Sequence, residues 1–241
     1  MKLLTAAAVA AVALLAGCAG LPPELAGVFG GVQETVTGPV LTEADIAAGL
    51  REALATGAGR AVQRIGVPDG FWTNPQLKIP LPENLQKVER ALRALGQGRT
   101  VDEFHLSLNR AAEQAVPEAL PIFRNAIRGI TLADARGILQ GPPNAATEYF
   151  RSRTQASLAA RFKPIVTQTT DAVGATRKYK ELAAKVSKYA TGFQAQDLDA
   201  YVTDRALMGL FRTLGEEEQR IRQDPAARTS ELLRKVFGGR Y

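Results

Sequence analysis

The sequence predicts an all-α protein: a single-domain bundle of about eight helices, with kinks at prolines, preceded by a lipobox signal peptide and a flexible tether. Three observations lead to this prediction. Apolar residues recur at helical spacing from Thr42 to the C-terminus. Residues that cap helices precede most of these stretches. Only residues 76–81 have a pattern that is compatible with a strand.

The composition is that of a globular protein. The chain has 241 residues, of which 46% are hydrophobic, and a formal charge of +6. It is too apolar for a disordered chain and long enough to bury a core without disulfides or structural metals. The isoelectric point of about 9.6 favours either a solvated basic surface or anionic partners such as lipid head groups and cell-wall carboxylates. We expect no nucleic-acid partner.

The N-terminal segment has the pattern of an export signal. Residues 3–16 are almost entirely apolar, but they are too few for the roughly 20 residues that span a bilayer. The run ends in Leu15-Ala16-Gly17-Cys18, which resembles the bacterial lipobox, where signal peptidase cuts before a cysteine that is then lipidated. We therefore expect residues 1–17 to be cleaved and Cys18 to carry a lipid anchor in the membrane.

The residues after the lipobox predict where the mature chain resides. Ala19 stands where an aspartate retains many lipoproteins in the inner membrane, so we expect the periplasmic face of the outer membrane in the bacterial cell envelope. Residues 18–41 contain glycines and prolines that interrupt any period, which predicts a lipidated cysteine and flexible tether. Residues 42–241 are predicted to form the all-α domain.

Local signals divide this domain into helices. The predicted starts are Thr42, Pro82, Thr100, Thr131, Asn144, Asp197 and Asp224. The predicted ends or bends are the turn at residues 67–70, Gly96, Pro117, Pro121, Gly141, Pro164, Gly174 and Gly238. Thr100 and Glu103 have the spacing of a capping box.

Apolar stripes predict how these helices pack. In the first helix, small residues such as Gly57 leave room for another helix to approach closely. The helix of residues 82–95 places its leucines, Leu95 included, on one face. The helix from Asp197 is apolar nearly all round, which predicts a central position, and the glutamates at 216–218 are expected to be its solvated end.

A polar stretch within the helix of residues 100–115 is the first candidate contact site. Asn109 and Glu113 lie one turn apart, and Arg110 adds a fork-shaped donor. The three side chains form either a buried hydrogen-bond network between two helices or a patch that contacts a ligand or partner.

A basic helix over residues 176–190 is the second candidate. Its charged face consists of Arg177, Lys178, Lys185 and Lys188. Its opposite face, expected to be buried, consists of Tyr179, Leu182, Val186 and Tyr189. The charged face either keeps the protein soluble or docks to anionic lipid or cell wall.

Few residues are suited to catalysis. His105 is the only histidine, so any serine triad would need it, and Ser107 is too near in sequence to face it on one helix. No zinc site of the usual type can be assembled, and we expect no metal and no cofactor. Residues 137–140 faintly resemble an element of lytic transglycosylases, but the Glu-Ser pair that should precede it is absent. Trp72 is expected to cover the core.

Five segments together resemble a family of bacterial envelope lipoproteins that is known only as domain of unknown function 4197. They are Pro68-Asp69-Gly70-Phe71, Lys78-Ile79-Pro80-Leu81-Pro82, Asn109-Arg110-Ala111-Ala112-Glu113, Ala133-Asp134-Ala135-Arg136-Gly137-Ile138-Leu139 and the stretch from Ala227-Arg228-Thr229 through Phe237. The resemblance covers nearly all of residues 42–238. It implies a lipoprotein and an all-α fold, and it brings no activity or catalytic residue.

The function expected from the sequence is a non-catalytic binding or interaction module, anchored by lipid in the periplasm. Its partner is an envelope protein, anionic lipid or cell wall. Two alternatives remain: a hydrolase or lyase that acts on cell wall or lipid, and a carrier of a lipid-like ligand. A deep polar cleft with a buried glutamate would favour the enzyme, a long apolar cavity the carrier, and a filled core with shallow grooves the binding module.

Overall fold

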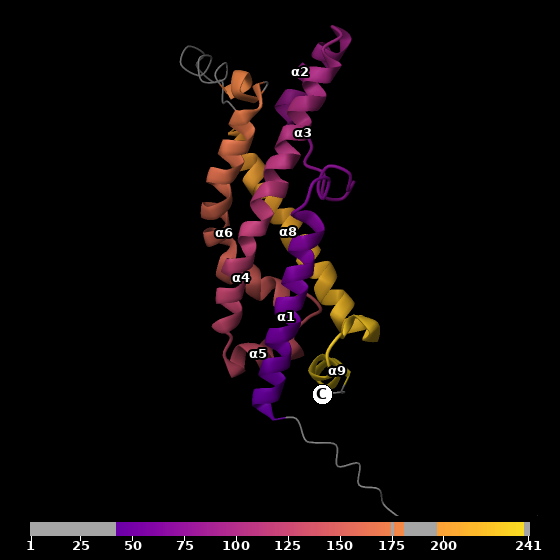
Figure 1. The fold of residues 1–241 in the computed structure, drawn as a ribbon, viewed down its shortest axis with the longest axis vertical. Helices are drawn as coiled ribbons and strands as arrows, with labels where there is room; N and C mark the ends of the chain where they lie inside the picture. Colours follow the sequence, from indigo (N-terminus) through magenta and orange to yellow (C-terminus); the bar gives the residue numbers. More distant parts are fainter. Residues whose placement is uncertain (1–41, 175, 181–196, 239–241) are drawn as a thin grey trace, which may run out of the picture. The chain divides into compact units, whose positions relative to one another are not determined.

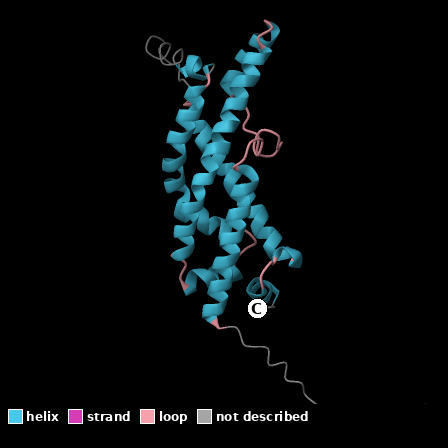
Figure 2. Ribbon diagram, in the orientation of Figure 1, coloured by secondary structure: helices cyan, strands magenta, loops and turns pink. Residues whose placement is uncertain are grey.

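α-Helices make up nearly all of the regular structure, as the sequence predicts (Figures 1 and 2). The computed structural model describes residues 42–174, 176–180 and 197–238, which belong to one compact unit. The helices are α1 (Glu43–Ile65), α2 (Glu83–Ala94), α3 (Gly98–Ala115), α4 (Ala119–Arg128), α5 (Leu132–Gln140), α6 (Ala145–Ala172), α8 (Leu198–Gln223) and α9 (Glu231–Gly238), with 3-10 turns η2 (Val116–Glu118) and η3 (Pro225–Ala227). None of these helices combines the length and apolarity needed to cross a membrane.

Three predicted helix starts are confirmed in atomic detail. Thr42 and Thr131 each accept a hydrogen bond from the backbone N–H three residues later, and the carboxylates of Asp45 and Asp134 each accept one from the threonine backbone N–H. These bonds hold the pKa of both aspartates below the usual value. Asp197 caps α8 by accepting from two backbone N–H groups of its first turn.

The predicted capping box at Thr100 is wrong. α3 begins two residues earlier, at Gly98, and its N-cap residue Gln97 makes no side-chain cap bond. Glu103 pairs instead with Arg99, at 2.9 Å. The preceding turn explains the difference: Gly96 adopts a φ of +74°, a conformation that glycine allows readily, so the chain reverses quickly and helix geometry resumes before Thr100.

α8 lies against several helices at once, as its apolar sequence predicts. It packs on α1, α3 and α6, while α6 also packs on α3 and α4; in Figure 1 α8 runs obliquely behind α3 and α1. Phe211 of α8 meets Phe123 of α4 with ring centroids 6.4 Å apart, and Phe123 meets Phe150 of α6 at 4.9 Å. These rings join three helices in one core.

Two glycines permit close approach to α8. A Cβ atom on Gly57 of α1 would lie 3.5 Å from Ile221, which is ordinary contact, as expected for a small residue between helices. A Cβ atom on Gly209 of α8 would lie only 2.6 Å from the ring of Phe71. The ring is fully buried, so Phe71, and not Trp72, closes the core at this place.

The strand expected at residues 76–81 does not form. Residues 75–77 form a turn, and residues 78–82 run without regular structure to α2. Their buried side chains, among them Leu77, Ile79 and Leu81, gave the alternating apolar pattern of a strand. The segment has no neighbouring strand among the described residues. The backbone of Ile79 pairs instead with Asn109 of α3, and the N–H groups of Leu77 and Lys78 donate to the carbonyl oxygen of Asn74 within the loop.

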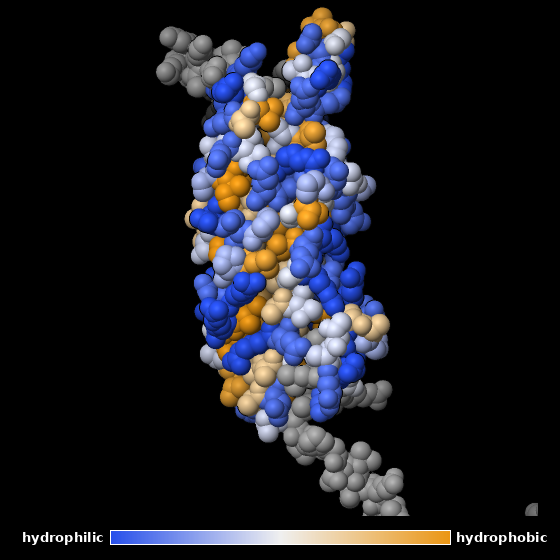
Figure 3. All heavy atoms as spheres, in the orientation of Figure 1, coloured by the Kyte–Doolittle hydropathy of each residue, from blue (hydrophilic) through white to orange (hydrophobic). Residues whose placement is uncertain are grey.

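The surface in Figure 3 has hydrophilic residues interspersed with small hydrophobic patches. Leu95 is 76% exposed, whereas Leu85 and Leu92, with which the sequence pattern places it on one face, are partly buried. It lies just past Ala94, where α2 ends, and the chain has already turned away from the bundle.

Candidate functional site

The polar stretch of α3 is a buried network, the first of the two predicted alternatives. Asn109 is fully buried. Its Oδ1 accepts from the N–H of Ile79 at 2.8 Å, and its Nδ2 donates to the carbonyl oxygens of Ile79 at 3.1 Å and His105 at 3.0 Å. The side-chain amide thus pairs with the backbone of Ile79 as a neighbouring strand would.

Glu113 holds the other end of the same loop. It is 3% exposed, and its Oε1 accepts from the N–H groups of Phe71 at 3.0 Å and Trp72 at 3.1 Å. Its Oε2 accepts from Arg110 at 2.6 Å, and Arg110 also donates to Asp69 at 2.7 Å. The bond with Glu113 raises the pKa of Arg110.

This network joins α3 to the loop of residues 66–82, and not two helices as the sequence suggested. Asn109 and Glu113 lie beneath the loop, where a partner cannot reach them while the loop is in place. Arg110 is the one member of the three with substantial exposure, at 31% of its side chain. Contact with a ligand or partner through Arg110 stays a prediction.

His105 has its ring engaged in structural contacts with the loop of residues 66–82. Its Nε2 lies 2.7 Å from the carbonyl oxygen of Ile79, and its ring meets Trp72 edge to face at 5.1 Å. Burial lowers the pKa of the imidazole. Ser107 hydrogen-bonds to Phe104 and Thr176, so it makes no dyad with His105.

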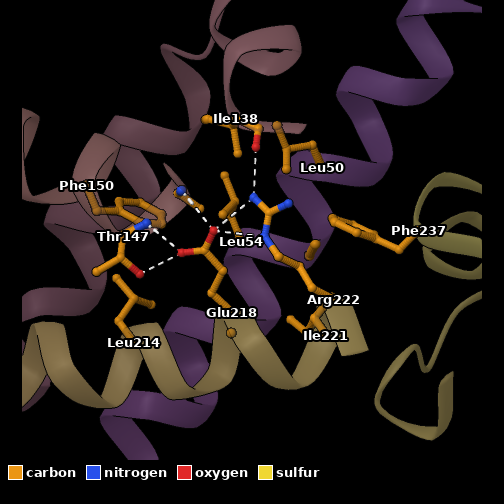
Figure 4. Close-up of a pocket in the computed structure, with 13 residues that line it drawn as sticks. Leu50, Leu54, Ile138, Thr147, Phe150, Leu214, Glu218, Ile221, Arg222 and Phe237 are labelled. Atoms are coloured by element: carbon orange, nitrogen blue, oxygen red, sulfur yellow. Dashed lines mark hydrogen bonds and ion pairs between the residues drawn. The ribbon is translucent and has the colours of Figure 1, made fainter. Parts of the chain in front are cut away.

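Glu218 occupies the centre of the pocket in Figure 4. Its carboxylate accepts from the N–H groups of Ala146 at 3.0 Å and Thr147 at 2.9 Å, and from the Thr147 hydroxyl at 2.7 Å. Arg222 donates to the same carboxylate at 2.9 Å and to the carbonyl oxygen of Ile138 at 2.8 Å. Glu218 therefore caps α6, whereas Asn144, the predicted cap, makes no side-chain cap bond.

The pocket around Glu218 contains little free space. Its cavity measures about 20 Å³, with apolar side chains such as Leu50, Leu54 and Phe150 on its walls. A space of this size holds one water molecule. The protein thus satisfies the hydrogen bonds of the carboxylate, and the cavity beside it is too small for a substrate.

The expectation that the three glutamates at 216–218 form a solvated end is wrong. Glu217 is 1% exposed and Glu218 is 9% exposed, and α8 continues to Gln223. The Oε1 of Glu217 lies 3.5 Å from Arg64 and 3.4 Å from Arg220, while its Oε2 has no hydrogen-bond partner among the described residues. The sequence did carry a signal for their burial, because Leu214 and Ile221 place this face of the helix inward.

The start of the predicted basic helix lies beside an apolar pocket of about 200 Å³ between α2 and α3. Arg177 and Lys178 are exposed, as predicted, and Tyr179 is partly buried against Phe104, with ring centroids 5.9 Å apart. The other residues named for this helix lie outside the described residues: Lys185, Lys188, Leu182, Val186 and Tyr189. Cys18 and the tether also lie outside them.

Metal ligands do not gather in the described part of the chain. No group of three or more His, Cys, Asp or Glu side chains there is placed to hold an ion. The acidic side chains that are buried serve helix caps and ion pairs, as with Glu113 and Glu218.

One family model matches this chain. It is described as "Protein of unknown function (DUF4197)" and covers residues 40–238, which include all of the helices described above. No curated protein matches, and no solved structure matches.

Proposed function

We propose that this chain, which belongs to the DUF4197 family, is a lipid-anchored helical module of the bacterial cell envelope that acts by binding and catalyses no reaction. The lipobox-like residues 15–18 support the anchor, and Ala19 supports the outer membrane. The partner is another component of the envelope.

The use of the buried carboxylates is the observation that carries this proposal. A cell-wall or lipid hydrolase needs a carboxylate that faces a cleft large enough for substrate. Glu113 holds the loop of residues 66–82, and Glu218 caps α6 beside a cavity of about 20 Å³. Glu217 lies between α1 and α8, near Gly57. This arrangement favours a scaffold over an active site.

The carrier alternative has less support. The apolar pocket beside Tyr179 measures about 200 Å³, and an engineered cavity of about 150 Å³ holds a single benzene ring. A long acyl chain needs several times that space. The pocket suits one ring or a short alkyl group, which is the scale of a contact with a partner's side chain.

Membrane fractionation tests the anchor. The wild-type chain should be processed and sediment with the outer membrane, while Cys18→Ser should remain as uncleaved precursor or leave that fraction. Ala19→Asp is the matched control: it should keep the lipid and move the protein to the inner membrane. Normal processing and sedimentation of the Cys18→Ser chain would contradict the proposal.

A second experiment tests the absence of catalysis. The purified protein is incubated with peptidoglycan and with phospholipid vesicles, and soluble fragments or free fatty acids are measured. We expect none above buffer. Release of either product that is abolished in Glu217→Gln, the variant that alters the carboxylate with an unpartnered oxygen, would establish the enzyme alternative.

A further inference from the structure

A small apolar hollow lies between α5 and the start of α1. It measures about 130 Å³, and α5 packs on α1 beside it (Figure 1). The ion pair of Arg136 and Glu43 lies along it. Its apolar walls come from Ile46 of α1 and from Leu132, Ala135 and Leu139 of α5. We call it the Ile46 hollow.

The side chains around the Ile46 hollow are only partly covered. Leu132 is 47% exposed, and Ile46 and Leu139 are partly buried. A single exposed leucine is common on protein surfaces, but here three apolar side chains surround one space. An engineered cavity of about 150 Å³ holds a benzene ring, so the hollow has room for one aliphatic side chain.

The residue that precedes α1 is placed to reach this space. Thr42 caps the helix, and Asp45 completes the capping box with bonds of 3.1 and 3.0 Å. In many helix starts of this kind, an apolar residue just before the cap packs on the fourth residue of the helix, a contact known as a hydrophobic staple. Those two positions are Leu41 and Ile46 in this chain, and Ile46 lines the hollow.

The other capping box of the protein shows where such residues lie. Thr131 and Asp134 form the same bonds at the start of α5. The residue before that cap is Ile130, and the fourth residue of that helix is Ala135; both are 2% exposed. The staple positions of α5 are therefore buried in the core, as the inference for α1 requires.

Two boundaries assign Leu41 to the helical domain. The family match begins at residue 40, before the cap of α1. The compact unit that contains all of the described helices begins at Leu41. Residue 41 thus belongs with the helices, although the sequence pattern alone places it at the end of the tether.

We infer that Leu41 occupies the Ile46 hollow as a hydrophobic staple, packing on Ile46 and covering Leu132. A staple fixes the angle at which the chain enters its helix. In a domain held on a membrane, this angle sets which face of the bundle turns toward the bilayer. That consequence rests on the proposed lipid anchor, whereas the contact itself does not.

The test is a double-mutant cycle in the purified full-length protein in detergent, with the melting temperature as the readout. Leu41→Ala and Leu132→Ala should each lower it by about 2–4 °C. The double variant should lower it by less than their sum, because both replacements remove the same contact. Leu41→Met should retain the wild-type value, since it keeps the apolar volume. Leu95→Ala is the matched control: this leucine is 76% exposed, so its effect should be near zero and additive with that of Leu41→Ala.

NMR of methyl groups tests the contact directly, and cross-peaks between Leu41 and Ile46 are expected. Their absence, an unchanged melting temperature for Leu41→Ala, or additivity of Leu41→Ala with Leu132→Ala would overturn the inference. A melting temperature that rises with protein concentration would instead assign the hollow to a second copy of the chain, and this too would overturn it. Fractionation of the Cys18→Ser chain tests the anchor separately, so the two failures are distinguishable.

Discussion

Three consecutive glutamates near the end of α8 provide a sharp test of how the fold is stabilised. Replacing each with glutamine keeps the shape and removes the charge. Glu216 pairs with Arg64 at the surface, Glu217 is buried with one unpartnered oxygen, and Glu218 is buried with every bond satisfied. Burial alone predicts that the second and third variants are equally damaging. Their hydrogen bonds predict instead that Glu218→Gln loses more stability than Glu217→Gln.

Glu218→Gln should lower the free energy of unfolding by about 3 kcal/mol. The glutamine NH₂ replaces one carboxylate oxygen and therefore faces the N–H group of either Ala146 or Thr147, which leaves one buried donor unpaired at a cost of about 1–3 kcal/mol. Arg222 also loses its carboxylate while only 18% exposed; breaking a fully buried pair costs about 3–5 kcal/mol. Its remaining bond to Ile138 and its partial exposure reduce that cost.

Glu217→Gln should change the same free energy by less than about 1 kcal/mol. Its two arginines are 36% and 52% exposed, so water solvates them once the carboxylate is gone. The substitution also removes a buried charge whose Oε2 makes no bond. Glu216→Gln, at the exposed pair, should likewise cost about 0–1 kcal/mol.

The assay is urea unfolding followed by circular dichroism, in which stability changes appear in the midpoint at constant slope. The variants are made in residues 41–241, which form one compact unit. If Glu217→Gln destabilised the protein as much as Glu218→Gln, the hydrogen bonds of Glu218 at the start of α6 would contribute no additional stability. The assignment of Glu218 as the cap of α6 would then be wrong.

Three further predictions concern the loop of residues 66–82 and its neighbours. Asn109→Leu should cost about 2–4 kcal/mol, because the N–H and C=O of Ile79 lose their partner, and limited proteolysis should then cut within the loop. NMR should show the single imidazole, His105, titrating below its ordinary pKa of about 6.5, since burial disfavours its charged form. The free energy of unfolding should fall as the pH drops from 6.5 toward the folded-state pKa, because in this range the unfolded chain binds a proton at His105 more readily than the folded chain does. His105→Gln should remove that pH dependence. Gly209→Ala should cost about 1–3 kcal/mol by overpacking against Phe71, whereas Gly59→Ala, with open space at its Cβ, should be neutral or stabilising by up to about 1 kcal/mol.

The sequence by itself determined the fold class and several helix boundaries. A capping box such as that of Thr131 and Asp134 involves residues three apart, and the left-handed turn at Gly96 needs only one residue that permits it. Both are local, so a short window of sequence contains all the groups involved. The apolar stripe of α1 was readable for the same reason, because helical periodicity is a local property.

Only the tertiary structure decided what the polar residues do. The carboxylate that caps α6 comes from Glu218, 72 positions after Ala146, and the partner of Asn109 is the backbone of Ile79, 30 positions before it. Asn144 had the right residue type for a cap and Thr100 had the right spacing, and neither makes the bond. A buried backbone group takes whichever acceptor the packed helices bring within about 3 Å. That choice depends on contacts between distant segments, which no local pattern records.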